Sequence, residues 1–590
     1  MLPHFFVSFV SGEFVVLHKW QLTKLSEAIK ITTVKFNLML RTGAAILAII
    51  GLFSCENTWM KNLLSKDKGD GTAGNPFRVY DKETLQHVGK ADGPDYSEWT
   101  LGAHYIQTQN IDMNGETLDA IGVSNSSPFT GSYNGNGKTI SNLGIYEPSI
   151  PYQGLFGYID SFATVKNVRM ENCNITGNNS TGSIVGCNYG LVQNCHAACN
   201  VSGNTNTGGI IGYNYGTVKN CYATGSVTGT DTVGGVVGTT SFFSKIENCH
   251  SVNSVEGTNY IGGVVGNAAG GSVKNCYATG SVRGIGTVIG TGEHIGGVVG
   301  NNSGGSTIQN CYATGHVEGR ANVGGIIGHN IGGTIQNCYA TGSVTGTHEN
   351  IGGLIGNLDS GIVEYCYNTG NVSGSTNVGG VVGINNFGST VENCYATGFV
   401  DGSTNVGGIV GSNTGGTIQN CYYATMFIAL TGSNHIGGIV GHLGNNGIVQ
   451  NCYATNSILG LGNTNVGGIV GGIDSGGIVK NCVALNLQIQ GLLDLGRVAG
   501  STGTLINNCA RDDMYGAYPP GSWPAIGSND QDGADLTVTG IGTANSYVFS
   551  DPNGWSSSVW SIPGGNLSTA NRTLPKLKNM PGAAQNPELP

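Results

Sequence analysis

The feature that most constrains this chain is a short motif that recurs at a nearly constant spacing. Asn-Cys-Tyr-Ala-Thr-Gly, or a close variant, appears repeatedly between about residues 170 and 510. Its cysteines are Cys173, Cys195, Cys221, Cys249, Cys276, Cys311, Cys338, Cys366, Cys394, Cys421, Cys452, Cys482 and Cys509. The interval between neighbouring cysteines averages about 28 residues, and a fixed period of this length is the signature of a repeat architecture.

A second motif of the form Gly-Gly-Ile-Val-Gly precedes most of these cysteines by about fourteen residues, as at 208–212, 324–328 and 407–411. Between the two motifs lies a short polar turn. No part of the unit shows the 3,4,7 apolar spacing of a helix, and its Val, Ile and Thr residues are interrupted by Gly every few positions. The unit therefore predicts short strands joined by tight turns.

The residues around Cys338 show how one unit is oriented. Alternation along a strand places Ile335 and Cys338 inward. The same alternation places Gln336 and Tyr339 outward. The pattern slips by one residue at Asn337, and Asn tolerates the left-handed backbone conformation that a sharp corner needs. We therefore predict a bend at this position and a hydrogen-bonded ladder of Asn side chains along the stacked corners.

Three short strands and three turns in about 28 residues predict one rung of a parallel β-helix, an all-β solenoid of about 13 to 16 rungs. Successive rungs would pair at a spacing of about 4.8 Å. The competing fold, a propeller, needs about 40 residues and four antiparallel strands per blade. A narrow coil also explains why Gly contributes 101 of the 590 residues, because only small side chains and close turns fit it.

The charge composition excludes two other classes of protein. Only 10% of the residues are charged and the net charge is −10, with no basic run, so the chain is not expected to bind nucleic acid. With 39% apolar residues the chain is also too hydrophobic for an intrinsically disordered protein.

The repeat unit resembles the GLUG motif of bacterial surface proteins, over about 340 residues. Segments upstream, at 110–113, 129–140 and 154–157, resemble the first rungs of such arrays, and 555–560 and 574–577 resemble a closing segment. The resemblance implies a right-handed parallel β-helix at the cell surface. It implies no single activity, because such repeats occur in adhesin-like proteins and beside the zinc peptidase domain of immunoglobulin-cleaving enzymes.

The zinc peptidase activity would require His-Glu-x-x-His, which places two imidazoles on one face of a helix. None of the twelve histidines stands in that arrangement. We therefore expect repeat scaffold without the protease, and neither a metal site nor a cofactor.

An apolar run of eleven residues at 43–53 is too short to cross a bilayer and fits the core of a signal peptide. The Leu-Phe-Ser-Cys sequence ending at Cys55 resembles a bacterial lipobox, in which Phe53 is unusual. We expect lipidation of Cys55 and membrane attachment by the lipid anchor only, on the bacterial cell surface or outer membrane. The alternatives are an ordinary secretory signal or an uncleaved anchor.

The expected organisation is an upstream lead-in that precedes the true start (1–38), a signal peptide (39–54), a polar tether (55–68), an N-terminal cap with the first rungs (69–165), the repeats (166–510) and a C-terminal cap (511–590). Caps are needed because an open β-helix end exposes unpaired strand edges. A short helix is predicted near Lys82 to Gly89, with Leu85 and Val88 on one side.

The position after each cysteine forms an outward aromatic stripe, with His196 and His250 in the early rungs. Its tyrosines are Tyr222, Tyr277, Tyr312, Tyr339, Tyr367, Tyr395, Tyr422 and Tyr453. Tyrosine offers an apolar body and a polar tip, so this stripe is the candidate binding surface for a glycan or a host or cell-surface protein. The alternative is structural, since aromatic neighbours on one face stabilise adjacent strands.

Two further columns have both structural and chemical interpretations. The cysteines form either a reduced apolar ladder or a partly disulfide-bonded one, with metal binding disfavoured by the lack of Cys-x-x-Cys. Glu364 and Glu392 would lie near the ~5 Å spacing of a retaining glycosidase, or form a solvated pair of like charges. Because no further polar side chains are expected to converge on these two residues, the solvated pair of like charges is favoured.

The chain is thus expected to be a non-catalytic adhesin-like surface lipoprotein, with a polysaccharide-active hydrolase or lyase as the alternative and a pure spacer as a third.

Overall fold

The computed structural model describes residues 6–10, 13–17 and 68–590, without 287–289, 387, 426–427, 433, 461–464, 517, 521, 537–548, 550–554, 564–572, 581–584 and 589–590. The chain divides into two units, Met1–Gly69 and Asp70–Pro590. In the first, β1 (Phe6–Val10) and β2 (Glu13–Leu17) form an antiparallel hairpin. The predicted signal peptide, Cys55 and the tether up to residue 67 lie outside the described residues.

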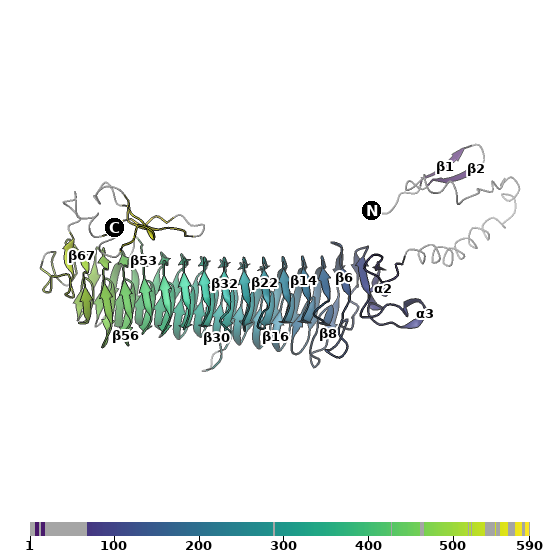
Figure 1. Cartoon of the computed structure of the whole chain (residues 1–590), viewed down its shortest axis with the longest axis horizontal. Helices are drawn as coiled ribbons and strands as arrows, with labels where there is room; N and C mark the ends of the chain where they lie inside the picture. The colour runs from purple at the N-terminus through teal and green to yellow at the C-terminus, as the bar shows by residue number, and fades with distance from the viewer. Residues whose placement is uncertain are drawn as a thin grey trace. The chain divides into compact units, whose positions relative to one another are not determined.

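The second unit is a parallel β-solenoid of about 16 coils with about 28 residues per coil, which confirms the predicted fold class (Figure 1). One wall is a 16-stranded sheet that runs from β3 (Phe77–Val79) to β66 (Thr504–Ile506). Its strands pair in parallel and in register, one from each coil. The right-handed turn of the coil stays a prediction from the family resemblance.

A typical coil contains five short strands where the sequence predicted three. They are β22 (Lys245–Glu247), β23 (His250–Ser251), β24 (Ser254–Gly257), β25 (Asn259–Gly262) and β26 (Val265–Ala268). β22 belongs to the 16-stranded sheet, and β23 and β24 to a second sheet. β25 and β26 each belong to a separate sheet of twelve strands. The prediction of three strands was wrong because backbone bends divide segments that the residue pattern leaves continuous.

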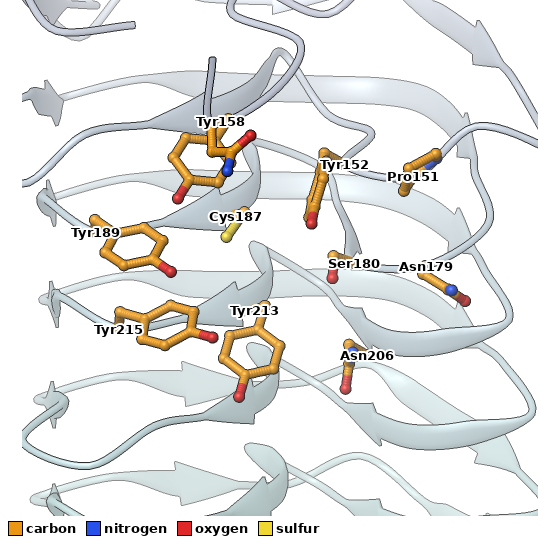
Figure 2. Close-up of a pocket in the computed structure, with 11 residues that line it drawn as sticks. Pro151, Tyr152, Tyr158, Asn179, Ser180, Cys187, Tyr189, Asn206, Tyr213 and Tyr215 are labelled. Atoms are coloured by element: carbon orange, nitrogen blue, oxygen red, sulfur yellow. The ribbon is translucent and has the colours of Figure 1, made fainter. Parts of the chain in front are cut away.

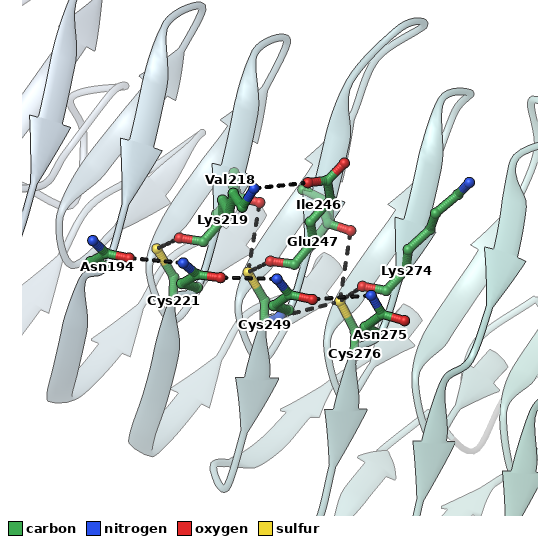
Figure 3. A network of polar contacts seen from close by, with 12 residues as sticks. Asn194, Val218, Lys219, Cys221, Ile246, Glu247, Cys249, Lys274, Asn275 and Cys276 are labelled. Carbon is green, nitrogen blue, oxygen red and sulfur yellow. Dashed lines mark hydrogen bonds and ion pairs between the residues drawn. The ribbon is translucent and has the colours of Figure 1, made fainter.

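The corner before each inward cysteine has the predicted left-handed backbone. Asn337 has φ +55°, and its Nδ2 donates to Oδ1 of Asn310 one coil earlier, at 3.2 Å. Tyr365, which replaces Asn in its coil, keeps the same conformation with φ +53°. Figure 3 shows this ladder of amides around Asn275, which donates to Asn248 at 3.1 Å. The predicted bend and the predicted ladder are both confirmed.

A second left-handed corner, not expected from the sequence, lies two residues before the Gly-Gly pair, at an Asn in some coils and at Thr232, Tyr260, His294 or His435 in others. Asn322, Asn350 and Asn377 have φ between +50° and +61°. The Nδ2 of Asn350 donates to Asn322 at 2.9 Å, and that of Asn377 donates to Asn350 at 2.8 Å. The next turn is crowded: a Cβ on Gly325 would lie 2.2 Å from the carbonyl oxygen of Gly353. The Gly-Gly pair is thus required by close approach between coils.

The upstream end contains the predicted helix. This helix, α2 (Lys82–Gln86), is capped by Asp81, whose carboxylate accepts from the backbone N–H of Thr84 at 2.9 Å. A second short helix, α3 (Gly93–Tyr96), follows it. Leu85 is fully buried in the solenoid core cluster.

At the downstream end, β68 (Ala534–Leu536) pairs in parallel with β67 (Cys509–Arg511). Met514 and Trp523 are buried in the same core cluster as the coils. None of the described helices is both long enough and apolar enough to cross a bilayer.

Candidate functional site

The outward aromatic residues form one continuous column of stacked rings along the second sheet. Each ring begins the strand that follows a left-handed corner, so parallel pairing brings equivalent rings into contact. The rings are His196, Tyr222, His250, Tyr277, Tyr312, Tyr339, Tyr367, Tyr395, Tyr422 and Tyr453. Neighbouring centroids are 3.8 to 5.0 Å apart and the ring planes lie within 8° of parallel. We call this arrangement the ring column.

The structure divides the ring column into two parts. From His196 to Tyr339 the rings are partly exposed, and we call this the open part. From Tyr367 to Tyr453 exposure falls from 4% to 0%, and we call this the covered part. Four of the eight tyrosines predicted to bind a partner are therefore inaccessible: Tyr367, Tyr395, Tyr422 and Tyr453.

The covered part lies beneath the C-terminal segment of the same chain. We call the described residues of 549–588 the C-terminal sheath (yellow in Figure 1). Its strands β69 (Trp560–Ser561) and β70 (Lys576–Leu577) pair in antiparallel orientation. Trp555 and Trp560 are both 1% exposed and belong to one apolar cluster with the covered tyrosines.

Hydrogen bonds fix the sheath on the column. The hydroxyl of Tyr453 donates to the backbone oxygen of Pro575 at 2.7 Å. The hydroxyl of Tyr422 donates to Oε1 of Gln585 at 3.0 Å. Gln585 in turn donates from Nε2 to the backbone oxygen of Leu577 at 2.7 Å. The segment predicted to cap the solenoid thus closes its end with Trp523 and covers its side with Trp555 and Trp560.

The open part has a neutral aromatic surface at physiological pH. Burial lowers the pKa of His250, which is stacked between Tyr222 and Tyr277, so its imidazole is favoured in the uncharged form. Burial also raises the pKa of Tyr312 and Tyr339, which keeps both hydroxyls protonated. These hydroxyls can both donate and accept hydrogen bonds.

In most coils the residue before the corner that precedes the inward cysteine is charged or carries an amide, and several of these side chains contact their neighbours in the next coil. Lys219 Nζ lies 3.7 Å from Glu247 Oε2, an exposed pair of small energetic weight (Figure 3). Further along, Gln309 donates to Gln336 at 2.9 Å. These contacts support adjacent strands.

The predicted carboxylate pair is register-matched. Glu364 on β42 (Ile362–Glu364) pairs with Glu392 on β47 (Thr390–Glu392). Burial, and then the charge of Glu392, raise the pKa of Glu364. Glu392 accepts a hydrogen bond from Gln419 Nε2 at 2.5 Å, so it continues the amide column. This arrangement fits the interpretation as a pair of like charges within a structural ladder.

The cysteine ladder is real but shorter than predicted. Its members are Cys195, Cys221, Cys249, Cys276, Cys311, Cys338, Cys366, Cys394, Cys421, Cys452 and Cys482. Cys338 illustrates the packing: its thiol donates to the backbone oxygen of Gln336 at 3.3 Å, and its N–H donates to Sγ of Cys366 at 3.3 Å. Every cysteine described in the solenoid is a free thiol, so the disulfide interpretation is wrong for these residues.

The first and last predicted members of the ladder lie elsewhere. Cys173 pairs with Cys199 across a register shift, because the preceding repeat element contributes Val168 to the ladder position. Cys509 pairs with Val483 and so occupies the position of the ring column. Both assignments were wrong because the motif does not follow the corner that carries the ladder. Cys173 follows another left-handed corner, at Asn172. Asn508 occupies the ladder position before Cys509. Among the residues that the structure describes, no three His, Cys, Asp or Glu side chains are grouped as metal ligands.

One group of residues was missed by the sequence analysis. Tyr158, Tyr189, Tyr213 and Tyr215 line a cavity on another face of the upstream coils. The signal was present, because Gly-Tyr-Asn-Tyr-Gly at 212–216 places rings where the next coils have Thr, Asn or Ser. We predicted binding residues from positions that recur from coil to coil, whereas these tyrosines occur only in the upstream coils.

Comparison with known proteins agrees with the repeat geometry. The model of the GLUG motif matches residues 203–228, 257–283, 291–318, 319–345, 347–373, 374–401 and 432–459. All seven segments lie in the coils that carry the cysteine ladder and the ring column.

Two curated relatives match part of the chain. Halomucin of Haloquadratum walsbyi is 33% identical over 134 residues, which is 22% of this chain and 2% of halomucin. A provisionally named Gly-rich membrane protein of Evansella cellulosilytica is 33% identical over 129 residues, which is 21% of this chain and 15% of that protein. The matched stretch is thus a small fraction of either relative.

Among solved structures, a provisionally named immunoglobulin A1 protease from Bacteroides ovatus aligns over 86% of this chain and 94% of its own, at 14% identity and a TM-score of 0.20. That score is too low to support an argument. The seven matched motifs, set in one stack of coils with the expected period, confirm that residues 203–459 of this chain contain GLUG repeats.

Proposed function

We propose that this protein is a non-catalytic, surface-exposed lipoprotein that acts as an adhesin-like scaffold and binds a glycan or a protein along the open part of the ring column. The observation that carries the proposal is the difference between the two parts of the column. The chain's own Trp-bearing sheath packs on the covered part, which supports stacked tyrosines of this geometry as a surface for aromatic and apolar groups. The open part has equivalent rings without such a partner among the described residues.

The surface location is supported by the kind of proteins in which the repeat occurs. One relative is named halomucin and the other a Gly-rich membrane protein. The composition agrees, since a long array with few charges and many outward Tyr, Thr and Asn side chains presents an extended surface for recognition.

The binding surface is tested by triple substitution of Tyr277, Tyr312 and Tyr339 with Ala. Adhesion of cells displaying the protein to a glycan array and to immobilised extracellular proteins is expected to fall at least about tenfold, because each exposed aromatic contact contributes roughly 0.5 to 1.5 kcal/mol. Tyr146→Ala serves as the matched control, since Tyr146 is 71% exposed and lies outside the column. Equal losses in both variants, or none, would contradict the proposal.

The membrane anchor is tested by Cys55→Ser. Lipidation of Cys55 would retain the chain in the membrane fraction, whereas the variant is expected in the soluble fraction, because it lacks the acyl chains whose burial in the bilayer supplies the anchoring. External protease added to whole cells should degrade the wild-type chain. Retention of the Cys55→Ser variant, or protection from protease, would contradict a lipid-anchored surface protein.

The alternative of a polysaccharide-active enzyme is tested with the same glycan panel. A binding scaffold is expected to return every glycan at its original length. Turnover that Glu392→Gln abolishes would identify the pair Glu364 and Glu392 as catalytic and overturn the non-catalytic assignment.

A further inference from the structure

A cavity of about 530 Å³ lies on the upstream coils, on a different sheet from the ring column (Figure 2). Its back wall is formed by β9 (Phe156–Ile159), β13 (Val185–Asn188) and β17 (Ile211–Asn214), which belong to one of the twelve-stranded sheets. Its volume lies within the range of about 300 to 1,000 Å³ that is typical of small-ligand sites.

The cavity exists because a small residue interrupts a column of rings. Cys187 pairs with Tyr158 on one side and with Tyr213 on the other. The backbones of the two tyrosines are therefore two coil spacings apart, about twice 4.8 Å. Cys187 is 3% exposed and lies at the floor between them (Figure 2). A spacing of two coils between these two positions corresponds to the room that one flat ring needs between two aromatic side chains.

Further tyrosines enclose this gap from the side. Tyr189 stacks on Tyr215 with centroids 4.1 Å apart and planes at 10°. Tyr189 also stacks on Tyr158, at 5.3 Å. Tyr152 meets Tyr158 edge to face, at 5.7 Å and 89°. The cavity thus offers aromatic faces and edges from several directions, with phenol hydroxyls between them.

The opposite rim is polar. Asn179, Ser180 and Asn206 line it (Figure 2). The Oδ1 of Asn206 already accepts from the hydroxyl of Thr239 at 2.6 Å, and Oδ1 of Asn179 accepts from that of Thr205 at 2.7 Å. Because both amide oxygens are occupied, the amide nitrogens are the groups left to donate to a ligand.

The cavity is uncharged. Its lining includes no Asp, Glu, Lys, Arg or His. Burial raises the pKa of Cys187 to about 12, and burial followed by the neighbouring Tyr215 hydroxyl raises that of Tyr213 to about 12. Thiol and phenols therefore remain protonated at neutral pH, so the site has no charge with which to balance an ionic ligand.

We propose that this cavity binds a sugar ring of a neutral carbohydrate, seated above Cys187 between Tyr158 and Tyr213. The apolar C–H face of a sugar packs on aromatic faces, and its hydroxyls pair with the amide donors of Asn179 and Asn206 and with the surrounding phenols. The proposal does not rest on the ring column, which lies on another sheet and can fail as a binding surface without affecting this site.

The experiment uses saturation-transfer NMR on the purified full-length chain with lactose, maltose, cellobiose and the charged trisaccharide sialyllactose. At least one neutral saccharide is expected to receive saturation from the protein, with a Kd of about 1 mM for a single enclosed ring. Cys187→Tyr fills the gap with a ring that the flanking coils already tolerate at the paired positions, so it is expected to abolish the signal. Tyr213→Thr copies Thr239 from the next coil and is expected to weaken binding about three- to tenfold.

The matched control is Asn267→Tyr, which adds a ring to the same column at the residue paired with Thr239, outside the cavity. This variant should bind like the wild type. No transfer to any neutral saccharide, or transfer that Cys187→Tyr leaves unchanged, would overturn the proposal. Stronger transfer to sialyllactose than to lactose would overturn the neutral class. Because Tyr277, Tyr312 and Tyr339 are intact in all of these variants, failure here is separable from failure of the proposed adhesion surface.

Discussion

Asparagine at the corner of each coil combines two properties in one side chain. It tolerates the left-handed conformation, which costs most other residues about 1 to 2 kcal/mol. Its amide also both donates and accepts, so the Nδ2 of Asn337 bonds to Asn310 while other members repeat the same contact along the stack. Glycine would satisfy the backbone but break the ladder. The same reasoning explains why Asn recurs at the second corner, at Asn350 and Asn377.

At residue scale, the largest single histidine contribution to the pH dependence of stability should come from His294, which stands in the second corner column. Burial first, and His329 second, lower its pKa from 6.5 to about 4. The folded state therefore binds fewer protons than the unfolded state in this window, so the free energy of unfolding is highest above pH 6.5 and falls as the pH drops towards 4. The loss should be at most roughly 3 kcal/mol.

His294→Asn introduces the residue that several other coils have at this corner. The free energy of unfolding of this variant should change less between pH 6.5 and pH 4 than that of the wild type. Urea unfolding at several pH values measures it, with the exposed His348→Asn as the control. An equally steep loss in His294→Asn would assign the effect to other groups.

At the scale of elements, the C-terminal sheath behaves as a strap over the last coils. Its two tryptophans replace water over the stacked tyrosines, with the centroids of Trp560 and Tyr453 5.9 Å apart. Burying a large aromatic side chain stabilises its surroundings by several kcal/mol. The sheath therefore depends on Trp555 and Trp560 more than on the short pairing of β69 with β70.

Trp560→Ala should release this strap and leave the coils folded. Truncating a buried Trp costs about 3 to 5 kcal/mol, more than a two-stranded ribbon supplies. We expect Tyr395, Tyr422 and Tyr453 to become reactive towards iodination, read by mass spectrometry, and the sheath to become protease-sensitive. Ser561→Ala, an exposed neighbour, is the control. Unreactive tyrosines in Trp560→Ala would show that other contacts hold the strap.

The predictions from sequence used the repetition of one motif. They are correct where each coil repeats that motif in the same register and wrong where the register differs. Cys338 inward, Tyr339 outward and a bend at Asn337 follow from alternation within one period, and all three are confirmed. Cys173 and Cys509 resemble the motif locally but pair in other columns. The register of a strand is set by its pairing with the neighbouring coils, so it cannot be read from the residues of a single motif.

The cover over the downstream tyrosines could not be predicted for a related reason. The hydroxyl of Tyr453 reaches Pro575 across 122 residues of sequence, and no periodicity links the sheath to the coils. The tyrosine cavity depends on the residues that differ between coils, such as Cys187. In both cases the information lies in departures from the repeat.

For the whole molecule, stacking makes each coil depend mainly on its two neighbours. Deleting residues 311–337 joins Asn310 directly to Cys338 and removes one coil with every column kept in register. This variant should fold cooperatively with an unchanged far-UV circular dichroism per residue. Deleting only 311–324 removes about half a coil and joins mismatched faces, so it should aggregate or unfold. If both deletions behaved alike, the coil would not be the unit of folding.

The sheath is tied to the last coils, and this has a consequence for how such a chain could vary. Each coil inserted upstream would lengthen only the uncovered stretch of rings, while the strapped stretch would keep its size. Repeat number would then set the valency of the molecule towards an extended polymer, and avidity rises steeply with the number of contacts that can be engaged at once.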